Sequence, residues 1–80
     1  MSEVWTAESK TDDLIAFSVR DETTGEVRTE ERYPEGLALM FATAGYPASV
    51  GVLVASPHHP CVFRKDGDTI CLSIEMEAGQ

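Results

Sequence analysis

Residues 14–33 of the chain read LIAFSVRDETTGEVRTEERY, and this stretch predicts a β-hairpin. In residues 14–20 every second position is large and apolar, which is the period of a half-buried strand. The turn that follows ends at Gly25, which can adopt the positive φ that closes a hairpin. Residues 26–33 return as the second strand with charges of alternating sign on one face. We expect this charged face to point to solvent and Val27 to lie on the other face.

A helix is predicted directly after the hairpin, over residues 34–44. Pro34 suits the first helical turn, where its missing N–H costs no hydrogen bond, and Gly45 ends the helix. Leu39 and Ala42 carry apolar character to the side away from the core, so we expect more protein or a partner to cover that side. The core-facing stripe of the helix is predicted to consist of Leu37, Met40, Phe41 and Ala44.

Four further strands are predicted outside these elements. Residues 49–55 are apolar on both faces when they are read with a two-residue period, so we expect them to form a central strand. Asp66-Gly67 between apolar segments predicts a second hairpin that pairs Phe63 with Ile70. The four predicted strands are Val4–Ala7, Ser49–Ala55, Cys61–Arg64 and Thr69–Glu75.

The predicted order βββαβββ indicates a single α+β domain over residues 1–80. We expect a curved, mainly antiparallel sheet of five to six short strands wrapped around one central helix, which is an α/β roll. An all-parallel sheet is excluded because only one helix is available for crossover connections.

The composition combines a small folded domain with a strong excess of acid. The 80 residues are 42% hydrophobic and contain 14 Asp or Glu against 6 Lys or Arg, a formal net charge of -8. A chain this short can bury one core but cannot also build the walls of a deep cleft, which argues against a large multistep enzyme. The negative charge argues against direct binding to nucleic acid or anionic lipid.

No charged residue occurs between Leu37 and Phe63, so a membrane span has to be considered. Gly45, Pro47 and Gly51 interrupt this segment, and basic flanking residues are lacking, so we expect it to be the buried centre of the protein instead. The N-terminus does not resemble a secretion signal. We therefore expect a cytoplasmic protein with reduced cysteines.

The segment 57–61, Pro-His-His-Pro-Cys, contains the side chains that could carry chemistry. His58, His59 and Cys61 could bind zinc with Cys71 as a fourth ligand, but the predicted hairpin places the two cysteines on opposite faces of the sheet. Cys61 near His59 is the only candidate nucleophile beside a base, and neighbouring side chains on an extended chain point apart. We expect no catalytic residue, no cofactor and no disulfide, and a metal site only as a minor alternative.

The acidic residues are the remaining candidates for a functional surface. Alternate residues on a strand lie about 6.8 Å apart, so strand and turn carboxylates can match the charge spacing of a nucleic-acid backbone. Such a surface would attract a basic groove on another protein, although Arg28 and Arg32 interrupt the acids and excess acid can serve solubility alone. The candidate partner-binding residues are Asp12, Asp13, Asp21, Glu22, Glu30, Glu31 and Glu35.

The small size, the compact roll and the acidic N-terminal half resemble, as a class, the anti-CRISPR proteins of phages and prophages. This resemblance implies a non-enzymatic inhibitor whose partner is a Cas effector complex, such as the type I surveillance complex. The inhibitor would occupy the basic DNA-binding groove of that complex. It transfers no role to any single residue of this chain.

The apolar outer side of the predicted helix supports a different class of function. Leu39, Ala42 and Tyr46 could form an apolar interface of a structural or regulatory module, either a homodimer or an accessory subunit. The sequence leaves open whether the protein is a monomer or a homodimer.

Overall fold

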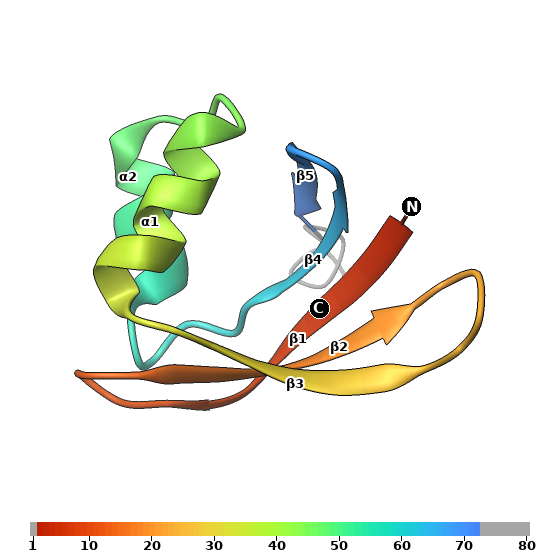
Figure 1. Cartoon of the computed structure of the whole chain (residues 1–80). Helices are drawn as coiled ribbons and strands as arrows, with labels where there is room; N and C mark the ends of the chain where they lie inside the picture. Colours follow the sequence, from red (N-terminus) through yellow and green to blue (C-terminus); the bar gives the residue numbers. More distant parts are fainter. Residues whose placement is uncertain (1, 73–80) are drawn as a thin grey trace, which may run out of the picture.

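The computed structural model describes residues 2–72, which form an α+β fold of one five-stranded sheet and two helices (Figure 1). Along the chain the elements are β1 (Ser2–Lys10), β2 (Ile15–Asp21), β3 (Val27–Arg32), α1 (Pro34–Thr43), α2 (Ala48–Ala55), β4 (Val62–Asp66) and β5 (Thr69–Leu72). Neither described helix is long and apolar enough to cross a membrane.

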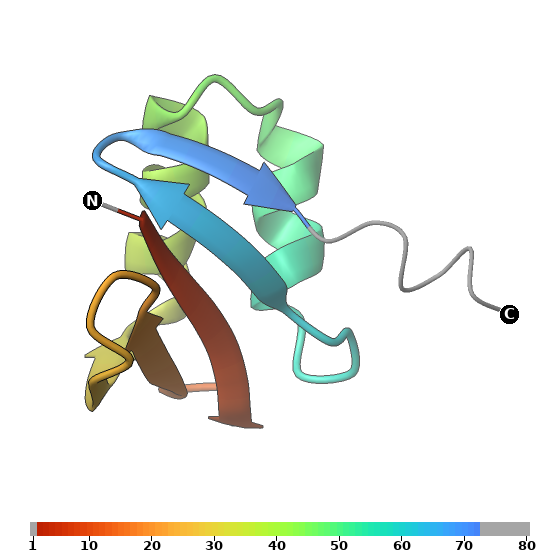
Figure 2. The same cartoon turned by 90° about the vertical axis from the view of Figure 1, so that its right-hand side faces the viewer.

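The sheet has the strand order β3-β2-β1-β4-β5, and all neighbouring strands are antiparallel. Figure 2 shows α1 and α2 side by side on one side of this curved sheet. The predicted α+β class and the antiparallel sheet are therefore confirmed. The predicted order βββαβββ and the single central helix are wrong, because the order is βββααββ with two helices and the sheet does not close.

Residues 49–55, which we expected to form the central strand, belong to α2 instead, and β1 takes the central place. With a helical period, Gly51 and Val54 face inward and are buried, whereas Val52 is exposed. A Cβ atom added at Gly51 would lie 3.2 Å from Cα of Ala38, so the glycine lets the two helices approach closely. Tertiary packing of small residues therefore decides the conformation of this short apolar segment.

The hairpin of β2 and β3 is confirmed, with Gly25 at φ 80° in its turn, but the face of β3 was predicted wrongly. Phe17 pairs with Glu30 and Val19 pairs with Arg28, so the charged residues of β3 share the inner face of the sheet with buried residues of β2. The reason is that β3 is an edge strand, and inward-pointing charges protect an edge from pairing with another chain.

The hairpin of β4 and β5 is also confirmed, with a register that differs from the predicted one. Asp66 pairs with Thr69 around a two-residue loop, which makes Leu72 and not Ile70 the partner of Phe63. A shift of two residues keeps every side chain on its predicted face. Residues 73–75 of the predicted last strand lie outside the described part of the chain.

The core lies between the sheet and the two helices and is rich in aromatic rings. The Trp5 ring stacks on Phe63 at a centroid distance of 5.5 Å and meets Phe17 edge-on at 5.2 Å. Phe41 from α1 contacts the Phe63 ring at 5.2 Å and so joins the helix layer to the sheet. The Tyr46 hydroxyl donates a hydrogen bond to the carbonyl of Ile70 (2.8 Å), which ties the connection between the helices to β5.

Candidate functional site

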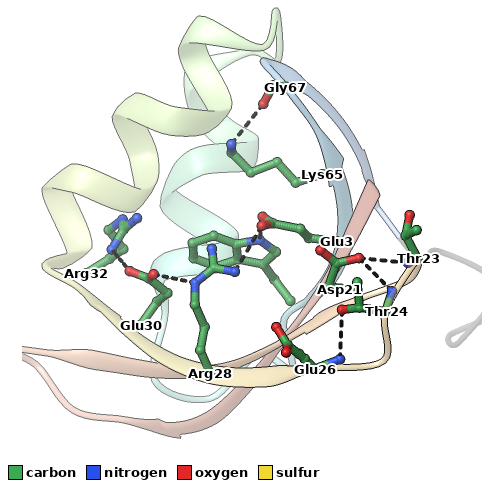
Figure 3. Close-up of polar contacts among 11 residues, drawn as sticks. Glu3, Asp21, Thr23, Thr24, Glu26, Arg28, Glu30, Arg32, Lys65 and Gly67 are labelled. Atoms are coloured by element: carbon green, nitrogen blue, oxygen red, sulfur yellow. Dashed lines mark hydrogen bonds and ion pairs between the residues drawn. The ribbon is translucent and has the colours of Figure 1, made fainter. Parts of the chain in front are cut away.

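Glu30, one of the predicted partner-binding acids, is held between two arginines on the inner face of the sheet (Figure 3). Its carboxylate accepts hydrogen bonds from Nε of Arg28 (2.6 Å) and from a terminal nitrogen of Arg32 (3.1 Å). Arg28 also donates to Glu3 at 3.0 Å. Hydrogen bonds from these guanidinium groups lower the pKa of Glu30 and of Glu3. Glu30 is therefore neutralised locally and does not present a free negative charge.

This ion network covers Trp5 from the open side of the sheet. The guanidinium carbon of Arg32 lies 5.1 Å from the centroid of the Trp5 ring, within the range of a cation–π contact. Glu3 accepts a hydrogen bond of 3.1 Å from the indole nitrogen of Trp5. The charged side chains of β3 thus complete the core at a place that the helices leave open.

Asp21 and Glu22 are engaged in the turn between β2 and β3. Asp21 accepts hydrogen bonds from the backbone N–H groups of Thr23 (2.7 Å) and Thr24 (3.2 Å), which closes the turn. Glu22 accepts two hydrogen bonds of 3.0 Å from the Arg64 guanidinium, which lowers the pKa of the carboxyl group. These two acids stabilise local structure, and they are poor candidates for a partner.

The other four predicted acids are exposed and lie at the opposite end of the sheet. Asp12 and Asp13 are in the turn where β1 ends and β2 begins, Glu31 is near the end of β3, and Glu35 is in the first turn of α1. In the part of the chain that the structure describes, none of their carboxylates is bonded to a lysine or arginine. We call Asp12, Asp13, Glu31 and Glu35 the acidic end. The structure thus does not bring the seven predicted partner-binding acids together on one surface, because only these four lie together and exposed.

Lys10 lies near the acidic end, but its charge is used inside the protein. Its ammonium group donates hydrogen bonds to the backbone carbonyls of Val54, Ser56 and His59. Partial burial lowers the pKa of this lysine. Lys10 therefore ties the C-terminal end of α2 and the following loop to the end of β1, a role that the sequence did not reveal.

The His-His-Pro-Cys segment borders an open cavity of about 330 Å³ beside the end of β1. Cys61 is buried, and burial raises the pKa of its thiol to about 11, so the reactive thiolate is disfavoured. As predicted, Cys71 lies on the face of the sheet opposite to Cys61. Cys71 is exposed, and both thiols are free. Among residues 2–72 no group of three or more His, Cys, Asp and Glu side chains is arranged to hold a metal ion. The geometry thus provides no activated nucleophile here.

The outer side of the two helices is apolar and exposed. α2 has no charged residue, and Glu35 is the one charged residue of α1. Tyr46, which was predicted to join this surface, is instead packed against the core through its hydrogen bond to Ile70. We call the set Leu39, Ala42, Val52 and Leu53 the helical surface; its large members are 66% (Leu39), 71% (Val52) and 50% (Leu53) exposed.

Comparison of the chain with protein-family models, with curated proteins and with solved structures found no match.

Proposed function

We propose that this chain is a non-enzymatic protein-binding module that docks through the helical surface. The observation that carries the proposal is the exposure of Leu39, Val52 and Leu53 on a helix pair with one charged residue. A helix that is apolar on all sides is typically buried, whereas a surface helix places polar residues toward water. The exposed apolar side of α1 and α2 is therefore expected to be covered by another protein.

The shape next to Leu39 supports this proposal. Leu39 and Met40 line a groove of about 200 Å³ with Ile70, between α1 and the hairpin of β4 and β5. An apolar side chain of a partner could enter this groove while Val52 and Leu53 are covered. Full burial of a large apolar side chain contributes about 1.5–3 kcal/mol, so covering these partly exposed side chains would favour binding.

The test is co-purification from cells that encode the chain, with the wild type and one triple variant as bait. In Leu39→Gln/Val52→Gln/Leu53→Gln the exposed apolar groups are replaced at positions that do not contribute to the core. Val27→Gln is the matched control, because Val27 is 62% exposed on β3, away from the helices. A protein that wild type and Val27→Gln retain at high salt and the triple variant loses would support the proposal. Equal retention by all three baits would refute it.

A second candidate function is inhibition of a protein with a basic nucleic-acid-binding surface, for which we propose a Cas effector complex as the target class. The observation in its favour is the acidic end, whose carboxylates bond to no arginine or lysine within residues 2–72. Glu22 and Glu30 are left out of this candidate because arginines pair with them. Binding of target DNA by a purified type I surveillance complex, with and without this protein, tests it.

The matched variants for that experiment change the same amount of charge at opposite ends of the sheet. Asp12→Asn/Asp13→Asn removes two charges from the acidic end, and Glu26→Gln/Asp68→Asn removes two from the far end. Inhibition of DNA binding that the first variant loses and the second keeps is expected. No inhibition by the wild type would exclude this target.

A further inference from the structure

We infer that the partner of the helical surface presents an apolar strip bordered by lysines or arginines, as a basic amphipathic helix does. The inference rests on the proposed docking function and adds the chemistry of the partner. It starts from the positions of the helical surface and the acidic end relative to each other.

The two helices run in opposite directions because a short connection joins them and Gly51 packs on Ala38. The first turn of α1, with Glu35, therefore lies beside the last turn of α2. The hydrogen bond from Lys10 to the carbonyl of Val54 holds that turn against the end of β1, two residues before Asp12. The acidic end consequently borders the helical surface at the end where Val52 and Leu53 lie.

No exposed base balances the acids along this border in the described structure. Lys10 is the nearest lysine in sequence, and three backbone carbonyls surround its ammonium group. Arg32 points to the inner face, where it bonds to Glu30 and covers Trp5. At the other border of the apolar groove Lys65 and Asp68 carry opposite charges. The electrostatic potential beside the helical surface is therefore negative at the acidic end. This potential favours a partner with positively charged residues at the border of its apolar strip.

The same charge distribution argues against a second copy of this chain as the occupant. A symmetric dimer through the helical surface would bring together two chains with a net charge of -8 each, with an acidic end on each side of the interface. Two acidic ends at a shared border would repel each other and oppose association, whereas a basic border on the partner would be attracted to the acidic end. A basic amphipathic partner thus satisfies the apolar surface and its acidic border together.

Two synthetic helical peptides of about 18 residues test this inference, because this length is sufficient for a helix. Both carry the same stripe of leucines, and the remaining positions are lysine in one peptide and glutamate in the other. Binding of each labelled peptide to the full chain is followed by fluorescence anisotropy. The protein variants are Val52→Gln/Leu53→Gln, Asp12→Asn/Asp13→Asn and the far-end control Glu26→Lys, which changes the net charge by the same amount as the aspartate pair. Circular dichroism checks that each variant is folded.

We expect the lysine peptide to bind at least about tenfold more tightly than the glutamate peptide, and to weaken as salt rises from about 50 to about 500 mM. Val52→Gln/Leu53→Gln should lower its affinity about tenfold or more, and Asp12→Asn/Asp13→Asn severalfold, while the far-end control should leave it unchanged.

Other outcomes overturn the inference in distinguishable ways. Equal binding of both peptides that is lost in Val52→Gln/Leu53→Gln would leave the docking function standing and reject the basic partner. Binding of the lysine peptide that is unaffected by Val52→Gln/Leu53→Gln would reject the docking function as well. Absence of binding, or a concentration-dependent dimer of the wild type in sedimentation at low salt that Val52→Gln/Leu53→Gln dissociates, would reject the basic partner.

Discussion

Lys10 donates a hydrogen bond from its ammonium group to the backbone carbonyl of Val54, which joins the end of the central strand to the last turn of α2. The carbonyl groups at a helix C-terminus have no partner within the helix and carry partial negative charge. A lysine from another part of the chain satisfies them here. This contact also sets which end of α2 lies beside the acidic end, so it orients the helical surface.

We expect Lys10→Met to lower the free energy of unfolding by about 1.5–3 kcal/mol, the usual contribution of a hydrogen bond to a charged group. The measurement is urea unfolding followed by circular dichroism. Lys65→Met is the control, because Lys65 donates to a turn carbonyl (Gly67, 2.8 Å) at the surface. A loss no larger than that of the control would contradict the role assigned to Lys10.

Gly51→Val should destabilise the protein by about 1–3 kcal/mol, because overpacking forces the two helices apart. The 3.2 Å separation between a Cβ atom at Gly51 and Ala38 leaves no room for a branched side chain. Gly36→Ala is the control, since a Cβ atom there meets nothing within 4 Å and alanine favours a helix. Thermal unfolding of both variants measures the change in stability. If Gly51→Val were as stable as the wild type, the helices would not pack at this point.

Stability should fall as the pH drops below about 4.5, the ordinary pKa of a glutamate. The pKa of Glu30 is lowered in the folded state by hydrogen bonds from Arg28 and Arg32, so the folded state favours the ionised form. The stabilisation by the ionised carboxylate is fully present above the pKa that Glu30 has in the unfolded state. It is lost as the pH falls and the carboxylate becomes protonated. Glu30→Gln should therefore show a shallower loss of melting temperature between neutral and acidic pH than the wild type.

The control for this acid series is Glu31→Gln, which removes the neighbouring carboxylate on the outer face of β3. Within residues 2–72 that carboxylate bonds to no arginine, so the slope should stay close to that of the wild type. Equal slopes for Glu30→Gln and the wild type would show that the arginine pairs do not contribute in solution.

The buried thiol of Cys61 should make the protein less stable at alkaline pH. Burial raises the pKa of its thiol from 9.0 to about 11, so the folded state keeps the proton that the unfolded state releases. The stabilisation is present below pH 9 and disappears as the pH rises through about 11, by up to about 3 kcal/mol. Unfolding of the wild type and of Cys61→Ala across this range isolates the contribution, because other alkaline groups titrate in both.

Thiol labelling of the native protein provides an independent check of the same burial. Cys71 is exposed and should react with a disulfide reagent at once, whereas Cys61 should react only when urea unfolds the chain. Rapid reaction of two thiols in the native protein would contradict the buried position of Cys61.

Local signals in the sequence were sufficient for two hairpins and one helix. The alternation around Ile15, Phe17 and Val19 and the glycines at 25 and 67 predicted the hairpins, because a strand period and a positive φ are properties of a few neighbouring residues. Pro34 and Gly45 likewise marked the first helix, and Gly45 has φ 100° at its end.

The sequence also separated the two cysteines correctly, although the register of their hairpin was predicted with a shift of two residues. It indicated the apolar outer side of α1 at Leu39, but not Val52 and Leu53, because residues 49–55 were read with the period of a strand. A period of three to four residues linking Val50, Gly51 and Val54 was the signal that could have identified α2.

Only the tertiary structure decided the remaining features, because each depends on residues far apart in the chain. Eight apolar and small residues are compatible with a strand or a helix, and the close approach of Gly51 to Ala38 selects the helix. The inner face of β3 became charged because that strand lies at the edge of the sheet. Strand pairing likewise decided which carboxylates are bonded to arginines. It brings Arg28 to Glu3 and Arg64 to Glu22, and the residues of each pair are too far apart in the sequence for a local pattern to predict the contact.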